Sequence, residues 1–160
     1  MDHDASMEVA IKMLKEKGDE GKGEFEKEIE IIKKISDENC ANFVKYIGKA
    51  VDQDCYYLVF ERLGRSLHEF VESKGLNRER LRFVDILKII KQLCPALRAL
   101  KRLKLVHTDI KTDNILLTRD EHALEVKVID VGSAKDVSDE IPERDRSRRA
   151  GCPNQTVHIR

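Results

Sequence analysis

The segment from His107 to Asn114 carries the side chains that are best suited to do chemistry. It reads His-Thr-Asp-Ile-Lys-Thr-Asp-Asn, and Asp109 within it is a carboxylate that could accept a proton from a hydroxyl. Asn114 offers an amide oxygen to a metal ion, and Asp130, sixteen residues further on in an Asp-Val-Gly run, could reach the same metal. Carboxylates, an amide and a lysine suit phosphoryl transfer, which depends on positioning and on neutralising phosphate charge.

Lys12 could supply the cation that holds the phosphates. It ends the run Val-Ala-Ile-Lys at 9–12, and Glu28 in the following segment could pair with its ammonium group. Taken alone, a lysine on a strand is most often a solvated side chain. Glu28 has close competitors in Glu26 and Glu30, and only its register with Ile29 selects it.

The elements that must position these groups begin with strands. Apolar residues alternate over 9–13, which predicts a half-buried strand that carries Lys12. After a glycine-rich break at 18–23, a helical period predicts an amphipathic helix through Phe25, Ile29, Ile32 and Ile35. Two aromatic and β-branched runs, 43–47 and 56–60, predict two strands joined by a turn at 52–54.

A helix dominates the second half. Its apolar seam falls at steps of four and three: Ile86, Ile90, Leu93, Leu97 and Leu100. Pro95 lies within the seam, and because proline lacks a backbone donor we expect a kink or two shorter helices. The stretches 115–117 and 124–128 predict a hairpin, and the charged run 139–149 predicts an irregular tail.

Composition narrows the class of partner. Lysine plus arginine and aspartate plus glutamate each number 30, so the formal net charge of zero favours neither nucleic acid nor an anionic membrane. No apolar run is long enough to span a membrane, and the first residues do not resemble a secretory signal. The four cysteines are scattered, which is typical of reduced structural thiols. We therefore expect an intracellular protein, in the nucleus or cytoplasm.

The motifs stand in the order in which protein kinases carry them. They are Val-Ala-Ile-Lys at 9–12, Glu28, His107 to Asn114, and Asp-Val-Gly at 130–132. The chain thus resembles the middle of a eukaryotic protein kinase catalytic domain. The His-Thr-Asp run at 107–109 and the Asp-x-Gly-Ser-Ala run at 130–134 resemble the LAMMER dual-specificity kinases, although splicing-factor kinases share His-Thr-Asp.

The resemblance implies a role for each matching position. It implies ATP binding by Lys12, Glu28, the gatekeeper Phe60, and the hinge from Glu61 to Leu63. It implies that Asp109 is the catalytic base, that Lys111 steadies the transferring phosphate, and that Asn114 and Asp130 bind Mg²⁺. His107 would be architectural.

The implied fold is α+β, a bilobal kinase-like fold that we expect to be truncated at both ends. Residues 1–62 would form a partial N-lobe and hinge, 63–136 a partial C-lobe, and 137–160 an irregular tail. The expected activity is transfer of the γ-phosphate of ATP to serine or threonine, or to tyrosine under dual specificity. The expected partners are protein substrates, with Ser/Arg-rich sequences among them; no direct contact with nucleic acid or membrane is expected.

Departures from the kinase pattern keep two alternatives open. The sequence has no Gly-x-Gly-x-x-Gly run and no Ala-Pro-Glu run, Val131 replaces the usual phenylalanine, and Thr112-Asp113 replaces Pro-Glu. The first alternative is a degenerate kinase-like protein that binds a nucleotide or a partner without catalysis. The second is an unrelated α+β interaction domain, whose aspartates and asparagine merely cap loops.

Overall fold

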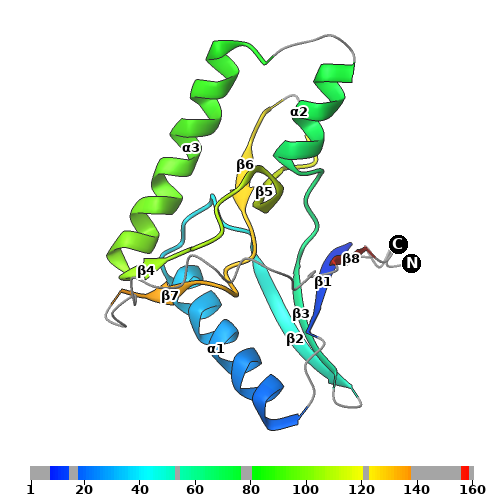
Figure 1. Cartoon of the computed structure of the whole chain (residues 1–160), viewed down its shortest axis with the longest axis vertical. Coiled ribbons are helices and arrows are strands. Elements are labelled where there is room, and N and C mark those ends of the chain that lie inside the picture. Colours follow the sequence, from blue (N-terminus) through cyan, green and yellow to red (C-terminus); the bar gives the residue numbers. More distant parts are fainter. Residues whose placement is uncertain are drawn as a thin grey trace, which may run out of the picture.

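The computed structural model describes residues 8–14, 18–52, 55–76, 81–120, 123–137 and 156–158. A four-stranded sheet and one helix form one part of the molecule (Figure 1). Two further helices and short strand pairs form the other part. The candidate site residues lie on strands, on the helix of the first part and on loops where these two parts meet.

The sheet has the strand order β2-β3-β1-β8, and neighbouring strands are antiparallel. Its members are β1 (Val9–Leu14), β2 (Tyr46–Asp52), β3 (Cys55–Glu61) and β8 (Thr156–His158). Lys12 pairs with Leu58 and Ala10 with Phe60, so the lysine lies two positions from the candidate gatekeeper pair. The expected strand over 9–13 is confirmed, whereas the strand expected at 43 begins only at Tyr46.

Helix α1 (Gly18–Asp37) packs its apolar face into the core. The four predicted apolar positions are all buried: Phe25, Ile29, Ile32 and Ile35. The helix begins at Gly18, so the prediction of a glycine-rich break over 18–23 is wrong. Tertiary packing of a strongly amphipathic face outweighs the roughly 1 kcal/mol that each glycine costs a helix.

Helix α2 (Leu67–Leu76) was not expected from apolar spacing. Its start is fixed by a capping box, because the backbone amide of Glu69 donates to Ser66 Oγ at 3.1 Å and the amide of Ser66 donates to Glu69 Oε2 at 2.9 Å. This Ser-x-x-Glu spacing is visible in the sequence and was the signal that could have predicted the helix.

Helix α3 (Phe83–Arg102) runs unbroken through Pro95. Of the two outcomes expected there, a kink or a division into two shorter helices, the division is wrong and the kink stays a prediction. Proline removes only one hydrogen bond of the ladder, and the helix is long enough to retain the remaining ones on both sides. Its buried face is centred on Ile89, Ala96 and Leu100. Of the predicted seam, only Leu100 is fully buried and Leu93 is partly buried. The other three members are exposed, so the predicted register of the buried face is wrong: Ile86, Ile90 and Leu97.

Short strands carry the two loops that hold the candidate catalytic residues. The predicted hairpin is confirmed as β5 (Ile115–Leu117) and β6 (Val126–Val128), preceded by the 3₁₀ turn η1 (Thr112–Asn114). Strands β4 (Leu105–Val106) and β7 (Lys135–Asp136) pair with each other. Each candidate loop therefore runs from one of these strand pairs to the other: 107–114 from β4 to β5, and 129–134 from β6 to β7.

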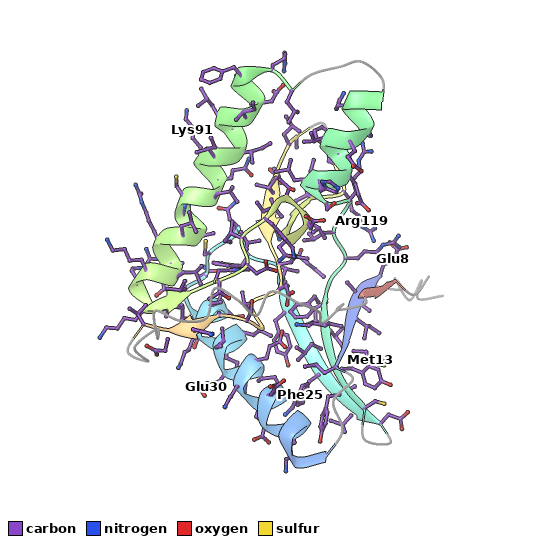
Figure 2. The ribbon with its side chains drawn as sticks, viewed as in Figure 1. Glu8, Met13, Phe25, Glu30, Lys91 and Arg119 are labelled. Carbon is purple, nitrogen blue, oxygen red and sulfur yellow. The ribbon has the colours of Figure 1, made fainter. Side chains whose placement is uncertain are left out.

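Backbone contacts join the two parts of the molecule behind the site. The amide of Val44 donates to the carbonyl of Val128 at 3.0 Å, and the amide of Val128 donates to the carbonyl of Asn42 at 2.8 Å. One buried apolar cluster also runs through both parts, drawing on α1, β3, α3 and β6. Phe25, labelled in Figure 2, is a member of this cluster that α1 places against the sheet, where its ring packs against Tyr56.

The remaining expectations concern the C-terminal stretch and membranes. Residues 156–158 form β8 within the segment expected to be irregular, while most of 138–160 lies outside the described residues. The division into 1–62, 63–136 and 137–160 stays a prediction. No helix in the described ranges has both the length and the apolar character that a membrane span requires.

Candidate active site

Lys12 joins three segments that are distant in the sequence. Its Nζ donates to Glu28 Oε1 at 2.7 Å and to Asp130 Oδ1 at 2.8 Å. Strand β1, helix α1 and the loop after β6 are thus fastened at one ammonium group. The Lys12 side chain is 16% exposed and that of Glu28 only 6%, so these ion pairs are mostly shielded from solvent screening.

Burial distinguishes Glu28 from its neighbours. Glu28 lies on the same face of α1 as Phe25 and Ile32 and is buried, whereas Glu26 and Glu30 are exposed. A buried carboxylate requires a partner, and Lys12 provides it. The structure therefore confirms the suggested contact between Lys12 and Glu28 and adds Asp130 as a second partner of Lys12, which was not expected from the sequence.

Opposing effects set the pKa of Lys12. Burial by itself would lower that pKa, but the negative charges of Glu28 and Asp130, with their hydrogen bonds, outweigh burial and raise the pKa above the ordinary value of 10.5. Lys12 is therefore a fixed cation at neutral pH, as a phosphate-binding group must be.

Asp109, Lys111 and Asn114 form a second cluster on the loop between β4 and β5. Asn114 Nδ2 donates to Asp109 Oδ2 at 2.8 Å and to the Asp109 carbonyl at 2.9 Å. Lys111 Nζ lies 2.9 Å from the same Oδ2, and its hydrogen bond to Asp109 raises the pKa of Lys111. Both contacts use Oδ2, so Oδ1 of this half-exposed carboxylate is the oxygen that could accept a proton.

Asn114 and Asp130 lie at the same end of the β5–β6 hairpin. Ile115 pairs with Val128, and the backbone amide of Ile129 donates to the Asn114 carbonyl at 3.0 Å. Asp130 therefore directly follows the residue that is hydrogen-bonded to Asn114. The Asn114 amide nitrogen points to Asp109, so its Oδ1 is the atom that could coordinate a cation.

This donor set fits magnesium. A carboxylate and an amide oxygen are hard ligands, and Mg²⁺ is commonly held by one or two protein oxygens together with water and phosphate. Within the described ranges no group of three or more His, Cys, Asp or Glu side chains could hold a metal by itself. A metal at this hairpin end would therefore depend on the phosphates for part of its coordination.

Phe60 and the segment after it stand at the edge of the site. Phe60 and Asp130 line one small cavity of about 20 Å³, and the Phe60 ring packs edge-on against Tyr46.

The Glu61 side chain accepts hydrogen bonds from Lys127 Nζ at 2.5 Å and from the Lys45 amide at 2.7 Å. Leu63 is buried. Sequence reasoning missed Lys127, because no local pattern links it to Glu61, 66 positions away.

Residues beside the two clusters hold the loops in place. His107 is buried, and its Nε2 must donate to the Ile129 carbonyl at 3.1 Å because that oxygen can only accept. Val131 occupies the place of the usual phenylalanine and belongs to the central apolar cluster. Gly132 lies against Glu28: a Cβ at position 132 would fall 2.8 Å from Glu28 Oε1.

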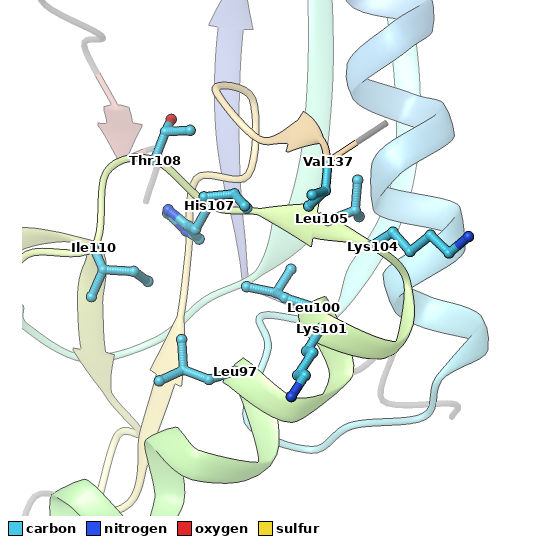
Figure 3. Close-up of a pocket in the computed structure, with 10 residues that line it drawn as sticks. Leu97, Leu100, Lys101, Lys104, Leu105, His107, Thr108, Ile110 and Val137 are labelled. Carbon is cyan, nitrogen blue, oxygen red and sulfur yellow. The ribbon is translucent and has the colours of Figure 1, made fainter. Parts of the chain in front are cut away.

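A hollow of about 770 Å³ lies on the other side of the His107 loop, toward α3 (Figure 3). Its lining is mainly apolar and includes Leu97, Leu105 and Ile110. None of the lysine, carboxylate or amide groups described above lines it. The hollow is therefore distinct from the site that the ion pairs define.

The fold and these two clusters define the class of protein as a kinase. The family model described as "Protein kinase domain" matches residues 1–152. A crystal structure of a kinase domain superposes with a TM-score of 0.73 at 27% identity, covering 88% of this chain and 47% of that one. The chain belongs to the protein kinase domain family, and the expected bilobal α+β kinase fold is confirmed.

Curated relatives refine this picture only in part. Homeodomain-interacting protein kinase 1 of Mus musculus is 35% identical over 133 residues, which is 81% of this chain and 11% of that protein. A G-type lectin S-receptor-like serine/threonine-protein kinase of Arabidopsis thaliana is 30% identical over 132 residues, which is 81% of this chain and 15% of that protein. The chain thus spans less than a fifth of the length of these relatives, and they do not single out the LAMMER kinases.

Proposed function

We propose that this chain contains the ATP-binding and catalytic residues of a protein kinase that phosphorylates serine or threonine in protein substrates. The observation that carries the proposal is the ammonium group of Lys12, held between Glu28 and Asp130 beside the Asp109–Asn114 pair. This arrangement supplies a fixed cation, a metal-binding carboxylate and a candidate base in one place, as phosphoryl transfer requires.

In this proposal Lys12 binds the α- and β-phosphates and Glu28 fixes the direction of its side chain. Phe60 closes the inner end of the nucleotide site, and the backbone from Glu61 to Leu63 meets adenine. The hydrogen bonds of Glu61 to Lys127 and to the Lys45 amide support a fixed hinge.

Asp109 receives the proton of the acceptor hydroxyl. Asn114 and Lys111 both hold Oδ2, and this leaves Oδ1 directed at the acceptor. Lys111 also supplies a positive charge near the transferred group. Asn114 and Asp130 would hold Mg²⁺, which neutralises charge that develops on the phosphates.

The substrate class rests on the sequence signature alone. Thr108 in the His-Thr-Asp run and Ser133 after Gly132 resemble the LAMMER kinases, so we propose Ser/Arg-rich substrates and dual specificity that includes tyrosine, in the nucleus or cytoplasm. The homeodomain-interacting and receptor-like kinases among the relatives make generic serine/threonine specificity the competing outcome.

A nucleotide-binding assay and a transfer assay test the proposal together. Fluorescent ATP is titrated with and without Mg²⁺ into the wild type, Lys12→Met and, as a matched control, Lys33→Met, which changes an exposed lysine of α1. We expect binding that Lys12→Met weakens at least tenfold and Lys33→Met leaves unchanged. Equal affinity of all three proteins would refute the nucleotide site.

Transfer from labelled ATP to a Ser/Arg-rich peptide and to a generic serine/threonine peptide tests catalysis. Asp109→Asn should abolish the transfer. Asp113→Asn is the matched control: it removes an exposed carboxylate four residues after Asp109, and this variant should retain the transfer. Magnesium-dependent binding without Asp109-dependent transfer would instead support the non-catalytic, nucleotide-binding alternative.

A further inference from the structure

Two residues that the kinase roles leave unused contact each other. Thr108 Oγ1 donates to the Ser133 carbonyl at 2.8 Å, and Ser133 Oγ donates to the His107 carbonyl at 3.3 Å. Thr108 directly precedes Asp109, and Ser133 follows Asp130 by three residues. The pair therefore links the loop of the candidate base to the loop of the metal-binding carboxylate.

The backbone at both loops is in an uncommon conformation. Thr108 has φ = 66° and Asp130 has φ = 58°, both in the left-handed region. Aspartate tolerates this region, but a β-branched threonine rarely occupies it unless its surroundings enforce it. The contact with the Ser133 carbonyl is such an enforcing contact at Thr108, and it lies next to the residue whose placement matters for proton transfer.

Further contacts give the two loops a common anchor. His107 donates to the Ile129 carbonyl, so three hydrogen bonds connect 107–108 with 129–133. The His107 side chain is buried, whereas Thr108 and Ser133 are exposed. The histidine fixes the inner end of the loop, and the Thr108–Ser133 contacts fix the outer end, where Asp109 begins.

We propose that Thr108 and Ser133 form a latch that sets the position of Asp109 relative to Asp130. They are positioning residues, since neither touches the phosphates or the metal in the proposed function, on which this inference rests. The latch explains why a small hydroxyl residue suits position 108: its donor reaches the neighbouring carbonyl without displacing the loop.

The sharpest substitution is Thr108→Val, because valine keeps the β-branched shape and removes only the hydroxyl. Thr108→Ser keeps the donor, and Ser133→Ala removes the second bond of the latch. Thr112→Val is the matched control, since it makes the same change at an exposed position of the same loop. Each variant is first compared with the wild type by thermal unfolding.

Hydrogen exchange measured by mass spectrometry tests the hydrogen bonds of the latch without requiring nucleotide. Thr108→Val should speed exchange about three- to tenfold in peptides covering both 106–110 and 131–135, the loss expected from one hydrogen bond. Ser133→Ala should loosen the same two peptides, and Thr108→Ser should match the wild type. If Thr108→Val behaves like Thr112→Val, or loosens only its own segment, the latch is refuted.

Magnesium dependence separates positioning from a general loss of stability. We expect Thr108→Val to reduce the gain in nucleotide affinity on adding Mg²⁺, while affinity without the metal stays close to wild type. Failure of the wild type to bind nucleotide would refute the proposed function, and the exchange result would still decide the latch. An unchanged magnesium gain in both Thr108→Val and Ser133→Ala would overturn the positioning role.

Discussion

Position 132 should not tolerate even one added methyl group, because the Glu28 carboxylate occupies the space beside Gly132 that a side chain would need. A Cβ at this position would lie 2.8 Å from Glu28 Oε1 and 2.9 Å from Cδ and Oε2. Ordinary contact begins near 3.4 Å, so the carboxylate must retreat by roughly 0.6 Å. Glu28 is buried and its partner Lys12 is also held by Asp130, so the ion pair cannot follow freely.

Two opposing effects decide whether Gly132→Ala stabilises or destabilises the folded protein. Replacing glycine reduces the entropy of the unfolded chain and stabilises by about 0.4–1 kcal/mol where the backbone conformation allows alanine. Weakening a buried hydrogen bond between charged groups costs about 1.5–3 kcal/mol. We therefore expect the free energy of unfolding to fall by about 1–2 kcal/mol. If the contact of Lys12 with the nucleotide loses the same free energy, nucleotide affinity should be about 5- to 30-fold weaker.

Thermal unfolding and fluorescent-nucleotide titration measure this prediction. Gly23→Ala is the matched control, because a Cβ there meets nothing within 4 Å and the glycine lies inside α1; this variant should be more stable than wild type. In a Glu28→Asp background, where the carboxylate is already withdrawn, Gly132→Ala should cost little. Additive effects of the two changes would refute the steric argument.

Three further predictions concern the groups around this contact. Asp130→Asn should remove most of the gain in nucleotide affinity on adding Mg²⁺, measured by titration with and without the metal; an unchanged gain would reject Asp130 as a ligand. The ion pairs that raise the pKa of Lys12 contribute their full stability below its ordinary value of 10.5, and this contribution is lost as pH rises through the folded-state pKa. On the alkaline side, the difference in the free energy of unfolding between wild type and Lys12→Met should therefore begin to shrink above about pH 10.5. Lys127→Met and Glu61→Gln should each lower the melting temperature, and the double variant should lose less than the sum, since both break one contact.

Local patterns predicted the parts of the site that lie on regular elements. Phe25 and Ile32 mark the buried face of α1, and Glu28 falls on that face by helical spacing alone. The alternation around Lys12 predicted its strand, and the hairpin that carries Asn114 and Asp130 followed from two short apolar runs. Periodicity succeeds here because burial of one face selects these elements.

Long-range contacts were beyond the reach of pattern reasoning. Lys12 and Asp130 are 118 positions apart, and only the folded chain shows that one ammonium group serves both carboxylates. The same limit hid the Glu61–Lys127 bond and the space that Gly132 leaves. Pro95 suggested two separate helices, but the proline costs the helix one hydrogen bond, and the stabilisation from packing of α3 is larger than that cost.

The charges of the site indicate which form of the nucleotide it should prefer. Lys12 contributes one positive charge, and Glu28 and Asp130 contribute two negative charges, so this cluster is net negative by one; Lys111 and Asp109 cancel. A free polyphosphate would approach a cluster of its own sign, and Coulomb repulsion in a partly buried site is poorly screened. A cation that arrives with the phosphates reverses this balance, because Asp130 then faces metal as well as ammonium. The acidic excess around Lys12 is therefore a physical reason for binding the magnesium complex in preference to the bare nucleotide.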